Sequence, residues 1–420
     1  MNHFNYKNNH LYCEDVKVAD IASKVGTPFY LYSHATVKQH FKVFDNAFSG
    51  IKHLTCFSVK ANSSLAILRL FLNEGSGLDI VSGGELFRAL RAGAQGNKIV
   101  YSGVGKQIED LEYAIKSGIL MFNAESSQEI HTIDEVAGRL GKKARIAIRV
   151  NPDVDPQTHP YISTGLKENK FGIEINEAFN QYLVANKLPN LKVEGISCHI
   201  GSQLTNIRPF EDALVKVIKL IEYLKHAGIT IKYLDIGGGL GITYKDEKPP
   251  HPDKYALAIK KTLNNPDLTL ITEPGRVIMG NAGVMITKVI YSKTAGDKLF
   301  YIMDAAMNDL MRPSLYDAFH AIQPVEIFHR KKVIADIVGP ICESGDFFAK
   351  ERQMEAYQPQ ELMAIMSAGA YGFTMSSNYN SRTRPCEVMV KNNCFYIIRN
   401  RETYEDLIRG EILPDFLEKS

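Results

Sequence analysis

Between residues 50 and 280, short apolar runs alternate with longer segments of helical period. The short runs are rich in β-branched residues and predict strands, while the longer segments repeat their apolar positions every three to four residues and predict helices. Eight runs predict strands, at residues 54–59, 78–81, 98–101, 119–122, 145–150, 193–199, 231–236 and 268–272. The helical segments include residues 64–74, 85–92, 108–116, 127–140 and 210–226.

This alternation is typical of a (β/α)8 barrel. Eight strand–helix units over roughly 230 residues come close to the ~250 residues that such a barrel usually occupies. A doubly wound open sheet is the alternative, but open sheets of this kind usually have fewer strands. We therefore expect an α/β barrel over residues 33–280.

The pattern changes after Gly280. Strand-like runs follow one another there without long helices between them, which predicts an all-β domain, a sandwich or a barrel. The apolar residues 29–32 would add a strand to it, so we expect one β domain built from residues 1–32 and 281–420. The runs are residues 283–291, 298–303, 332–337, 361–366, 387–390 and 394–398.

Polar and glycine-rich clusters directly follow the eight predicted barrel strands. The active site of a (β/α)8 barrel lies at the carboxyl ends of its strands, so these clusters predict a ring of functional groups at one end of the barrel. They are Lys60, residues 82–85, residues 102–105, Asn123 with Glu125, Asn151, residues 199–203, residues 237–239 and residues 273–276.

Three consecutive glycines, residues 237–239, follow the seventh strand. Backbone amides after strands seven and eight of a barrel often bind phosphate, and glycine lets the backbone come close to such a group. A tight turn that needs positive φ is the alternative explanation. A dinucleotide fingerprint is excluded, because its third glycine would fall on Ile242.

Lys60 would stand at the inner end of the first strand. A buried ammonium is costly unless it is paired or used chemically, so Lys60 is a candidate Schiff-base former, although it could also extend to solvent. Pyridoxal 5′-phosphate (PLP) would connect the two observations, because it needs a lysine, a phosphate site and a partner for its ring nitrogen.

Composition restricts the partners. The 49 Lys and Arg nearly balance the 47 Asp and Glu, with a formal net charge of +2, so charge gives no reason to expect nucleic acid or a membrane surface as a partner. The N-terminus lacks the apolar core of a secretory signal. The six cysteines are scattered, without metal-ligand spacing, and no metal site is expected. We expect a reduced, cytoplasmic protein.

Several segments, taken together and in order, resemble the barrel-type PLP-dependent decarboxylases, which have the alanine racemase-like fold. Two segments of the C-terminal half, residues 339–346 and 368–372, are similar to the branch of that family that converts meso-2,6-diaminopimelate to L-lysine and CO2, the last step of lysine biosynthesis. The resemblance covers roughly residues 10–410. The other matching segments are residues 58–63, 199–203, 237–239 and 273–276.

The resemblance implies roles in binding PLP. Lys60 would hold PLP covalently, His199 would stack on its ring, and Glu273 would keep its ring nitrogen protonated. The remaining cofactor-binding residues would bind the phosphate. They are Ser202, Gly238, Gly239, Pro274, Gly275, Arg276 and Tyr371.

The resemblance also implies roles toward the substrate. Cys342 would donate a proton to the α-carbon after CO2 leaves, and Glu343 would recognise the distal ammonium group. Arg276, Arg312 and Tyr316 would bind substrate carboxylate, with Tyr371 nearby. Cys342 and Glu343 would act in the neighbouring subunit's site, which implies a homodimer with shared active sites. Taken alone, Cys342 would be read as a small buried thiol.

Other interpretations remain open from the sequence. A decarboxylase of ornithine, arginine or carboxynorspermidine would share the barrel but handle another distal group, and Glu343 stands where ornithine-type enzymes usually have Asp. An alanine racemase-like enzyme fits the segment around Cys342 less well. A non-catalytic PLP-binding protein would not need the β domain. Asp79 and Glu85 are expected to support the site, for example by orienting His199, rather than to react.

Overall fold

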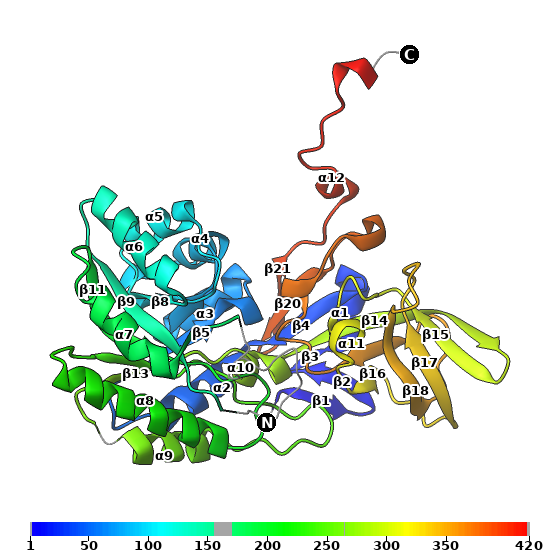
Figure 1. Ribbon diagram of the computed structural model, residues 1–420. Coiled ribbons are helices and arrows are strands. Elements are labelled where there is room, and N and C mark those ends of the chain that lie inside the picture. The colour runs from blue at the N-terminus through cyan, green and yellow to red at the C-terminus, as the bar shows by residue number, and fades with distance from the viewer. Residues whose placement is uncertain (1, 155–169, 264, 418–420) are drawn as a thin grey trace. The chain divides into compact units, whose positions relative to one another are not determined.

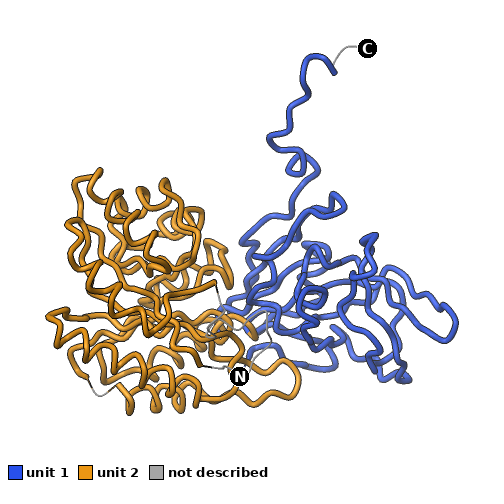
Figure 2. Tube along the Cα trace, in the orientation of Figure 1, with its two compact units in different colours: residues 1–35, 282–420 blue, residues 36–281 orange. Residues whose placement is uncertain are grey.

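The computed structural model describes residues 2–154, 170–263 and 265–417. The chain divides into two compact units, residues 36–281 and residues 1–35 with 282–420 (Figure 2). Among the described residues, none of the helices has both the length and the hydropathy needed to cross a bilayer.

The unit of residues 36–281 contains a closed ring of eight parallel strands (Figure 1). Every neighbouring pair in the ring is parallel, and the pairing of β9 with β8 closes it, which excludes the open sheet. The short β10 (Ile173–Glu174) pairs with β9 outside the ring. The ring consists of β5 (His53–Ser58), β6 (Gly77–Ile80), β7 (Ile99–Tyr101), β8 (Met121–Ala124), β9 (Ala144–Asn151), β11 (Leu191–Ser197), β12 (Tyr233–Asp235) and β13 (Thr269–Thr272).

Amphipathic helices connect the strands, as the period of the sequence predicts. Their apolar stripes are buried, as in α8, where the side chains from Phe210 to Leu224 at helical spacing are inaccessible. Ser82 and Ser126 cap two of the helices by accepting a backbone N–H. The helices are α2 (His34–Ala47), α3 (Leu65–Asn73), α4 (Gly83–Arg91), α5 (Ile108–Lys116), α6 (Ser127–Arg139), α7 (Ile175–Ala185), α8 (Arg208–His226), α9 (Pro252–Leu263) and α10 (Arg276–Met279).

The second unit is built around a mixed sheet. The predicted strand just after Pro28 is confirmed: β4 (Phe29–Ser33) lies between β14 and β20, antiparallel to the first and parallel to the second. The main path runs β18-β17-β15-β14-β4-β20-β21, and β19 pairs with β14 and β16. These strands are β14 (Gly283–Ala295), β15 (Lys298–Met303), β16 (Ile322–Pro324), β17 (Lys332–Val338), β18 (Phe347–Glu355), β19 (Leu362–Ile365), β20 (Cys386–Lys391) and β21 (Cys394–Arg399).

Shorter elements complete this unit. Three strands form a small antiparallel sheet near the N-terminus, and apolar residues of β1, β2 and α1 share a core with β4, β14 and β20. The elements are β1 (Phe4–Lys7), β2 (His10–Cys13), β3 (Val16–Lys17), α1 (Val18–Val25), α11 (Arg312–Tyr316) and α12 (Tyr404–Leu407). The sequence pattern did not predict β18, β16 or the three N-terminal strands.

Candidate active site

Lys60 lies directly after β5, in a short 3-10 turn of residues 59–61. Its Nζ donates a hydrogen bond to Asp79 Oδ2 at 3.0 Å, and Ser58 Oγ donates to the same oxygen at 2.8 Å. Asp79 is fully buried on β6, whereas the Lys60 side chain is 39% exposed. The carboxylate therefore holds the partly exposed lysine at the carboxyl end of the barrel.

Glu273, just after β13, is buried among hydrogen-bond donors. Ser102 Oγ donates to Glu273 Oε1 at 3.1 Å, and Asn123 Nδ2 donates to the same oxygen at 3.4 Å and to Asp235 Oδ2 at 2.8 Å. Asp235 and Glu273 also share a hydrogen bond. The carboxyl ends of β7, β8, β12 and β13 therefore bring two acidic groups and their donors together.

Burial raises the pKa of both acids. It raises the pKa of Asp235 to about 6, and it raises the pKa of Glu273 well above its usual range, with the charges of Asp235 and Asp79 adding to the effect. Among the described residues, Asp79 Oδ1 and Asn123 Oδ1 are buried and accept no hydrogen bond. This end of the barrel therefore has several buried acids and unused acceptors, and a cationic group placed there would favour the charged forms of these acids.

His199 lies just after β11 and is neutral. Burial first, then the positive charges of Arg149 and Lys60, hold the pKa of His199 well below its usual range. The backbone N–H of Gly238 donates to His199 Nδ1 at 3.2 Å. Because Nδ1 accepts this bond, the ring proton is on Nε2. A neutral imidazole fixed in this way can stack on an aromatic cation without repelling it.

The three glycines after β12 are required by close packing. A Cβ on Gly238 would lie 2.3 Å from the carbonyl oxygen of Glu273, and one on Gly239 would lie 2.4 Å from that of Gly201. Gly237 and Gly239 also have φ of +65° and +110°. Close packing and positive φ therefore explain why glycine stands at these positions, even if no ligand binds there. A phosphate-binding role for Gly238 and Gly239 stays a prediction.

Arg276 and Ser202, both predicted to bind the cofactor, contact each other. Arg276 Nη2 donates to Ser202 Oγ at 2.9 Å, and Nη1 donates to the Tyr244 hydroxyl at 2.8 Å. Arg276 is the first residue of α10, directly after Pro274 and Gly275, and it is 7% exposed. A buried guanidinium with two hydroxyl partners forms a preorganised anion-binding group.

The other predicted residues belong to the unit of residues 1–35 and 282–420. Arg312 is 7% exposed, donates from Nε to His320 Nε2 at 3.4 Å, and lies over the Tyr316 ring at 5.8 Å. Tyr371 has a left-handed φ of +54°. Arg312 and Tyr316 are therefore neighbours at the two ends of α11.

Cys342 and Glu343 lie on an exposed loop of this second unit. Asn380 Oδ1 accepts the backbone N–H of Cys342 at 3.0 Å, and Asp346 Oδ2 accepts that of Ile341 at 2.7 Å. The Cys342 thiol is free and exposed. The alternative interpretation of Cys342 as a small buried thiol is therefore excluded, because its loop is anchored through backbone groups and leaves the side chain exposed.

Sequence reasoning missed several buried polar residues at the barrel end. Asp235 was not singled out, although an acid inside an apolar strand just before three glycines is itself a signal. The Arg149–Glu125 ion pair, 2.8 Å long and buried, was also missed. Asp79 was expected to support His199, and the structure shows it hydrogen-bonded to Lys60.

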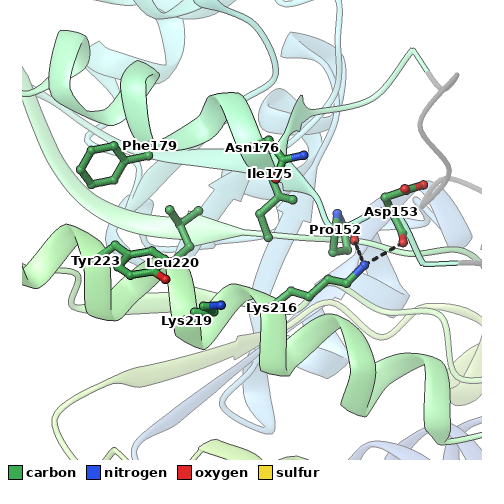
Figure 3. Close-up of a pocket in the computed structure, with 9 residues that line it drawn as sticks. All are labelled: Pro152, Asp153, Ile175, Asn176, Phe179, Lys216, Lys219, Leu220 and Tyr223. Carbon is green, nitrogen blue, oxygen red and sulfur yellow. Dashed lines mark hydrogen bonds between the residues drawn. The ribbon is translucent and has the colours of Figure 1, made fainter.

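A hollow of about 490 Å³ lies elsewhere, between α7 and α8 (Figure 3). It is lined by apolar side chains such as Phe179 and Leu220, and Lys216 Nζ donates there to the carbonyl oxygens of Pro152 and Asp153 at 2.8 and 3.0 Å. None of the predicted site residues lines this hollow.

A barrel with a lysine, a neutral histidine and a buried acid at its carboxyl end fits the PLP-binding class of enzymes. The described residues contain no group of three or more His, Cys, Asp or Glu arranged to hold a metal ion. Residues 34–280 match the family described as pyridoxal-dependent decarboxylase, pyridoxal binding domain.

Relatives that match over nearly the full length show to which branch of this family the chain belongs. The chain is 52% identical over 408 residues to the diaminopimelate decarboxylase of Aquifex aeolicus, with 97% of each chain covered. Solved diaminopimelate decarboxylases with L-lysine bound are similar too. The Helicobacter pylori structure has TM-score 0.91, 45% identity and 94% and 98% coverage, and the M. jannaschii structure has TM-score 0.94, 37% identity and 99% and 100% coverage. The chain belongs to the diaminopimelate decarboxylases.

Proposed function

We infer that this protein decarboxylates meso-2,6-diaminopimelate to L-lysine and CO2, with PLP as its cofactor. The observation that carries the inference is the cluster of buried carboxyl groups around Lys60, found in a chain that matches a diaminopimelate decarboxylase over 97% of its length. The L-lysine bound in the related Helicobacter pylori and M. jannaschii enzymes is the expected product.

The barrel residues suit the cofactor. When bound, PLP supplies an electron sink that accepts the electron pair left as CO2 departs. Lys60 would bind its aldehyde carbon, and Glu273 would hold a proton on its ring nitrogen. His199, neutral and fixed through Nδ1, would pack on the ring face. The phosphate would be bound by Ser202, Gly238, Gly239, Pro274, Gly275, Arg276 and Tyr371.

The chemical step breaks the bond between the α-carbon and its carboxylate, and the α-carbon must then gain a proton. We propose that Cys342 donates this proton. Its exposed thiol, on a loop anchored by Asn380 and Asp346, supports the assignment. The hydrogen bond from Lys60 Nζ to Asp79 would hold the lysine amine at the site whenever it is not bound to the cofactor.

Substrate selection follows from charge. Meso-diaminopimelate carries a second carboxylate and a second ammonium group at its distal end. A guanidinium binds a carboxylate with two parallel hydrogen bonds, so Arg276 and Arg312 suit this task, with Tyr316 and Tyr371 as hydroxyl donors. Glu343 would pair with the distal ammonium group. A substrate with only a distal amine would leave Arg312 without a function.

We propose that two copies form a homodimer in which Cys342 and Glu343 of each copy, carried by its β domain, complete the active site of the partner subunit. The exposure of the Cys342 loop supports this arrangement. We also propose that the protein works in the cytoplasm, because all six of its cysteines are free thiols, as is usual in a reducing compartment.

The test is CO2 release by the PLP-loaded protein from meso-diaminopimelate, LL-diaminopimelate, ornithine, arginine, lysine and carboxynorspermidine in parallel. We expect release from meso-diaminopimelate alone, with stoichiometric lysine. Lys60→Ala should abolish both turnover and the absorbance of bound PLP, whereas Lys116→Ala, an exposed lysine paired with Glu112, should change neither. CO2 release from a polyamine precursor would refute the assignment of meso-diaminopimelate as substrate. PLP binding without CO2 release from any of these compounds would refute the assignment as a decarboxylase.

A further inference from the structure

His320 is a fully buried histidine of the second unit and lies between α11 and β16. Its Nδ1 lies 2.8 Å from the carbonyl oxygen of Met366, directly after β19. Its Nε2 lies 3.4 Å from Nε of Arg312, the first residue of α11. The imidazole therefore links a residue predicted to bind substrate carboxylate to the mixed sheet of this unit.

The two contacts determine where the ring of His320 carries its proton. A carbonyl oxygen can only accept a hydrogen bond, so Nδ1 carries the proton and donates it to Met366. The Nε–H of a guanidinium can only donate, so Nε2 of His320 is the lone pair that accepts it. His320 is therefore a neutral imidazole, and it presents one acceptor to the Arg312 guanidinium.

The backbone around His320 is held by two further hydrogen bonds. Nη1 of Arg352, on β18, donates to the carbonyl oxygen of His320 at 3.0 Å, and the Arg352 guanidinium lies 4.1 Å from the centre of the Phe319 ring. The N–H of Met366 donates to the carbonyl oxygen of Ala321 at 2.8 Å. Because both its ring and its backbone are fixed, His320 can hold the side chain that it contacts in one orientation.

We propose that His320 is the positioning residue for Arg312 and thereby helps to select a substrate with a distal carboxylate. The inference rests on the proposed function, in which Arg312 binds that carboxylate. A guanidinium is a rigid planar fork that meets a carboxylate with two parallel N–H donors. The hydrogen bond to His320 occupies Nε, so Nη1 and Nη2 would meet the carboxylate at a fixed angle. His320 is 0% exposed and offers no surface to the substrate itself.

A purely structural role is the alternative, because a buried imidazole with both nitrogens paired also supports the fold. Two amide substitutions separate the roles. His320→Asn can keep a donor toward Met366 but removes the acceptor from Arg312. His320→Gln can place its carbonyl oxygen near the position of Nε2 and so keeps the acceptor, while it loses the donor. A structural role predicts similar effects of the two variants, whereas a positioning role predicts different ones.

The test measures KM and kcat for CO2 release from meso-diaminopimelate by the PLP-loaded protein and its variants. We expect His320→Asn to raise KM about tenfold and to leave kcat within about twofold, because it removes one hydrogen bond to a charged group that binds substrate. His320→Gln should stay within about threefold of the unaltered KM for the same reason. If His320→Asn fails to fold by circular dichroism, His320→Leu, which also lacks the acceptor, replaces it.

His53→Asn is the matched control. His53 Nδ1 also contacts a backbone carbonyl oxygen, that of Ile51 at 3.1 Å, and its Nε2 contacts a side chain, Asp45 at 3.3 Å. His53 begins β5, at the opposite end of that strand from Lys60. We expect His53→Asn to lower the Tm and to leave KM unchanged.

A double-mutant cycle tests whether His320 acts through Arg312. In an Arg312→Ala background, His320→Asn should raise KM no further, because the interaction that it removes is already absent. An unchanged KM in His320→Asn, an equal rise in His320→Gln, or a full additional rise in the Arg312→Ala background would refute the positioning role and leave the proposed function intact. A PLP-loaded unaltered protein that releases no CO2 from meso-diaminopimelate would refute the proposed function, and the role of His320 with it.

Discussion

The carboxylate of Asp346 organises the loop that carries Cys342. It is 4% exposed, and it accepts the backbone N–H of Met307 at Oδ1 and that of Ile341 at Oδ2, both at 2.7 Å. Burial raises the pKa of Asp346, and these two backbone bonds oppose that rise. If Cys342 is the proton donor, we predict that Asp346→Asn lowers kcat at least tenfold and leaves PLP binding unchanged.

The magnitude follows from the two bonds. Asparagine keeps one carbonyl oxygen but places an NH2 group against the second backbone N–H. The variant therefore loses one charge-assisted bond, worth ~1.5–3 kcal/mol, and leaves a buried donor unsatisfied at a cost of ~1–3 kcal/mol. A penalty of about 3 kcal/mol on the ordered loop changes the ratio of ordered to displaced loop by roughly 100-fold. Part of this loss will be relieved by relaxation, so tenfold is the lower bound.

The assay combines steady-state CO2 release, the absorbance of bound PLP and the Tm. Asp336→Asn is the matched control, because Asp336 is also 4% exposed and accepts the N–H of Glu351 at 2.7 Å, but its partners are Glu351 and Lys298 rather than the backbone of the Cys342 loop. We expect both variants to lose Tm and only Asp346→Asn to lose kcat. An unchanged kcat in Asp346→Asn, or an equal loss in the control, would refute the reasoning.

Two further predictions concern substrate binding and pH. Arg312→Ala should raise the KM for meso-diaminopimelate tenfold to a hundredfold, because it removes charge-assisted bonds worth ~1.5–3 kcal/mol; an unchanged KM would count against a carboxylate role. Burial alone would raise the pKa of Glu402, but hydrogen bonds from Arg384 and Asn378 lower it from 4.5 to about 2. This bond set therefore contributes stability that is present above pH 4.5 and is lost as the pH falls toward 2, and chemical denaturation of Glu402→Gln should show a flatter acid profile.

The barrel could be predicted because its strands are buried on both faces. Such strands read as continuous apolar runs, and all eight predicted runs overlap the observed strands. β18 could not be predicted in the same way. It is the terminal strand of its sheet and carries Lys350, Glu351 and Arg352 at its exposed centre, so its sequence has neither an apolar run nor a clean alternation. β18 is a strand because it pairs with β17, and its own pattern of apolar and polar residues does not indicate one.

The candidate site was predictable to a similar degree. Lys60, His199, Glu273 and Arg276 could be placed at the carboxyl end of the barrel because each lies at or shortly after the end of a predicted strand, where the topology of a barrel collects functional groups. Asp235 lies within a strand, and the sequence does not show that folding brings its carboxyl group next to that of Glu273. The roles assigned to the second unit came only from the resemblance, because spacing along the chain does not say which groups meet.

The cluster of buried acids gives the barrel site its chemical character. Asp79, Asp235 and Glu273 are each at most 7% exposed, and the hydrogen bond from the Lys60 ammonium goes to Asp79. The raised pKa values of Asp235 and Glu273 mean that the folded chain disfavours their charged forms. A protonated ring nitrogen would stabilise those forms, so PLP binding should release protons from this acid pair. A site built only for a neutral ligand would have no use for this arrangement, and a buried acid pair serving stability alone would be better replaced by apolar groups.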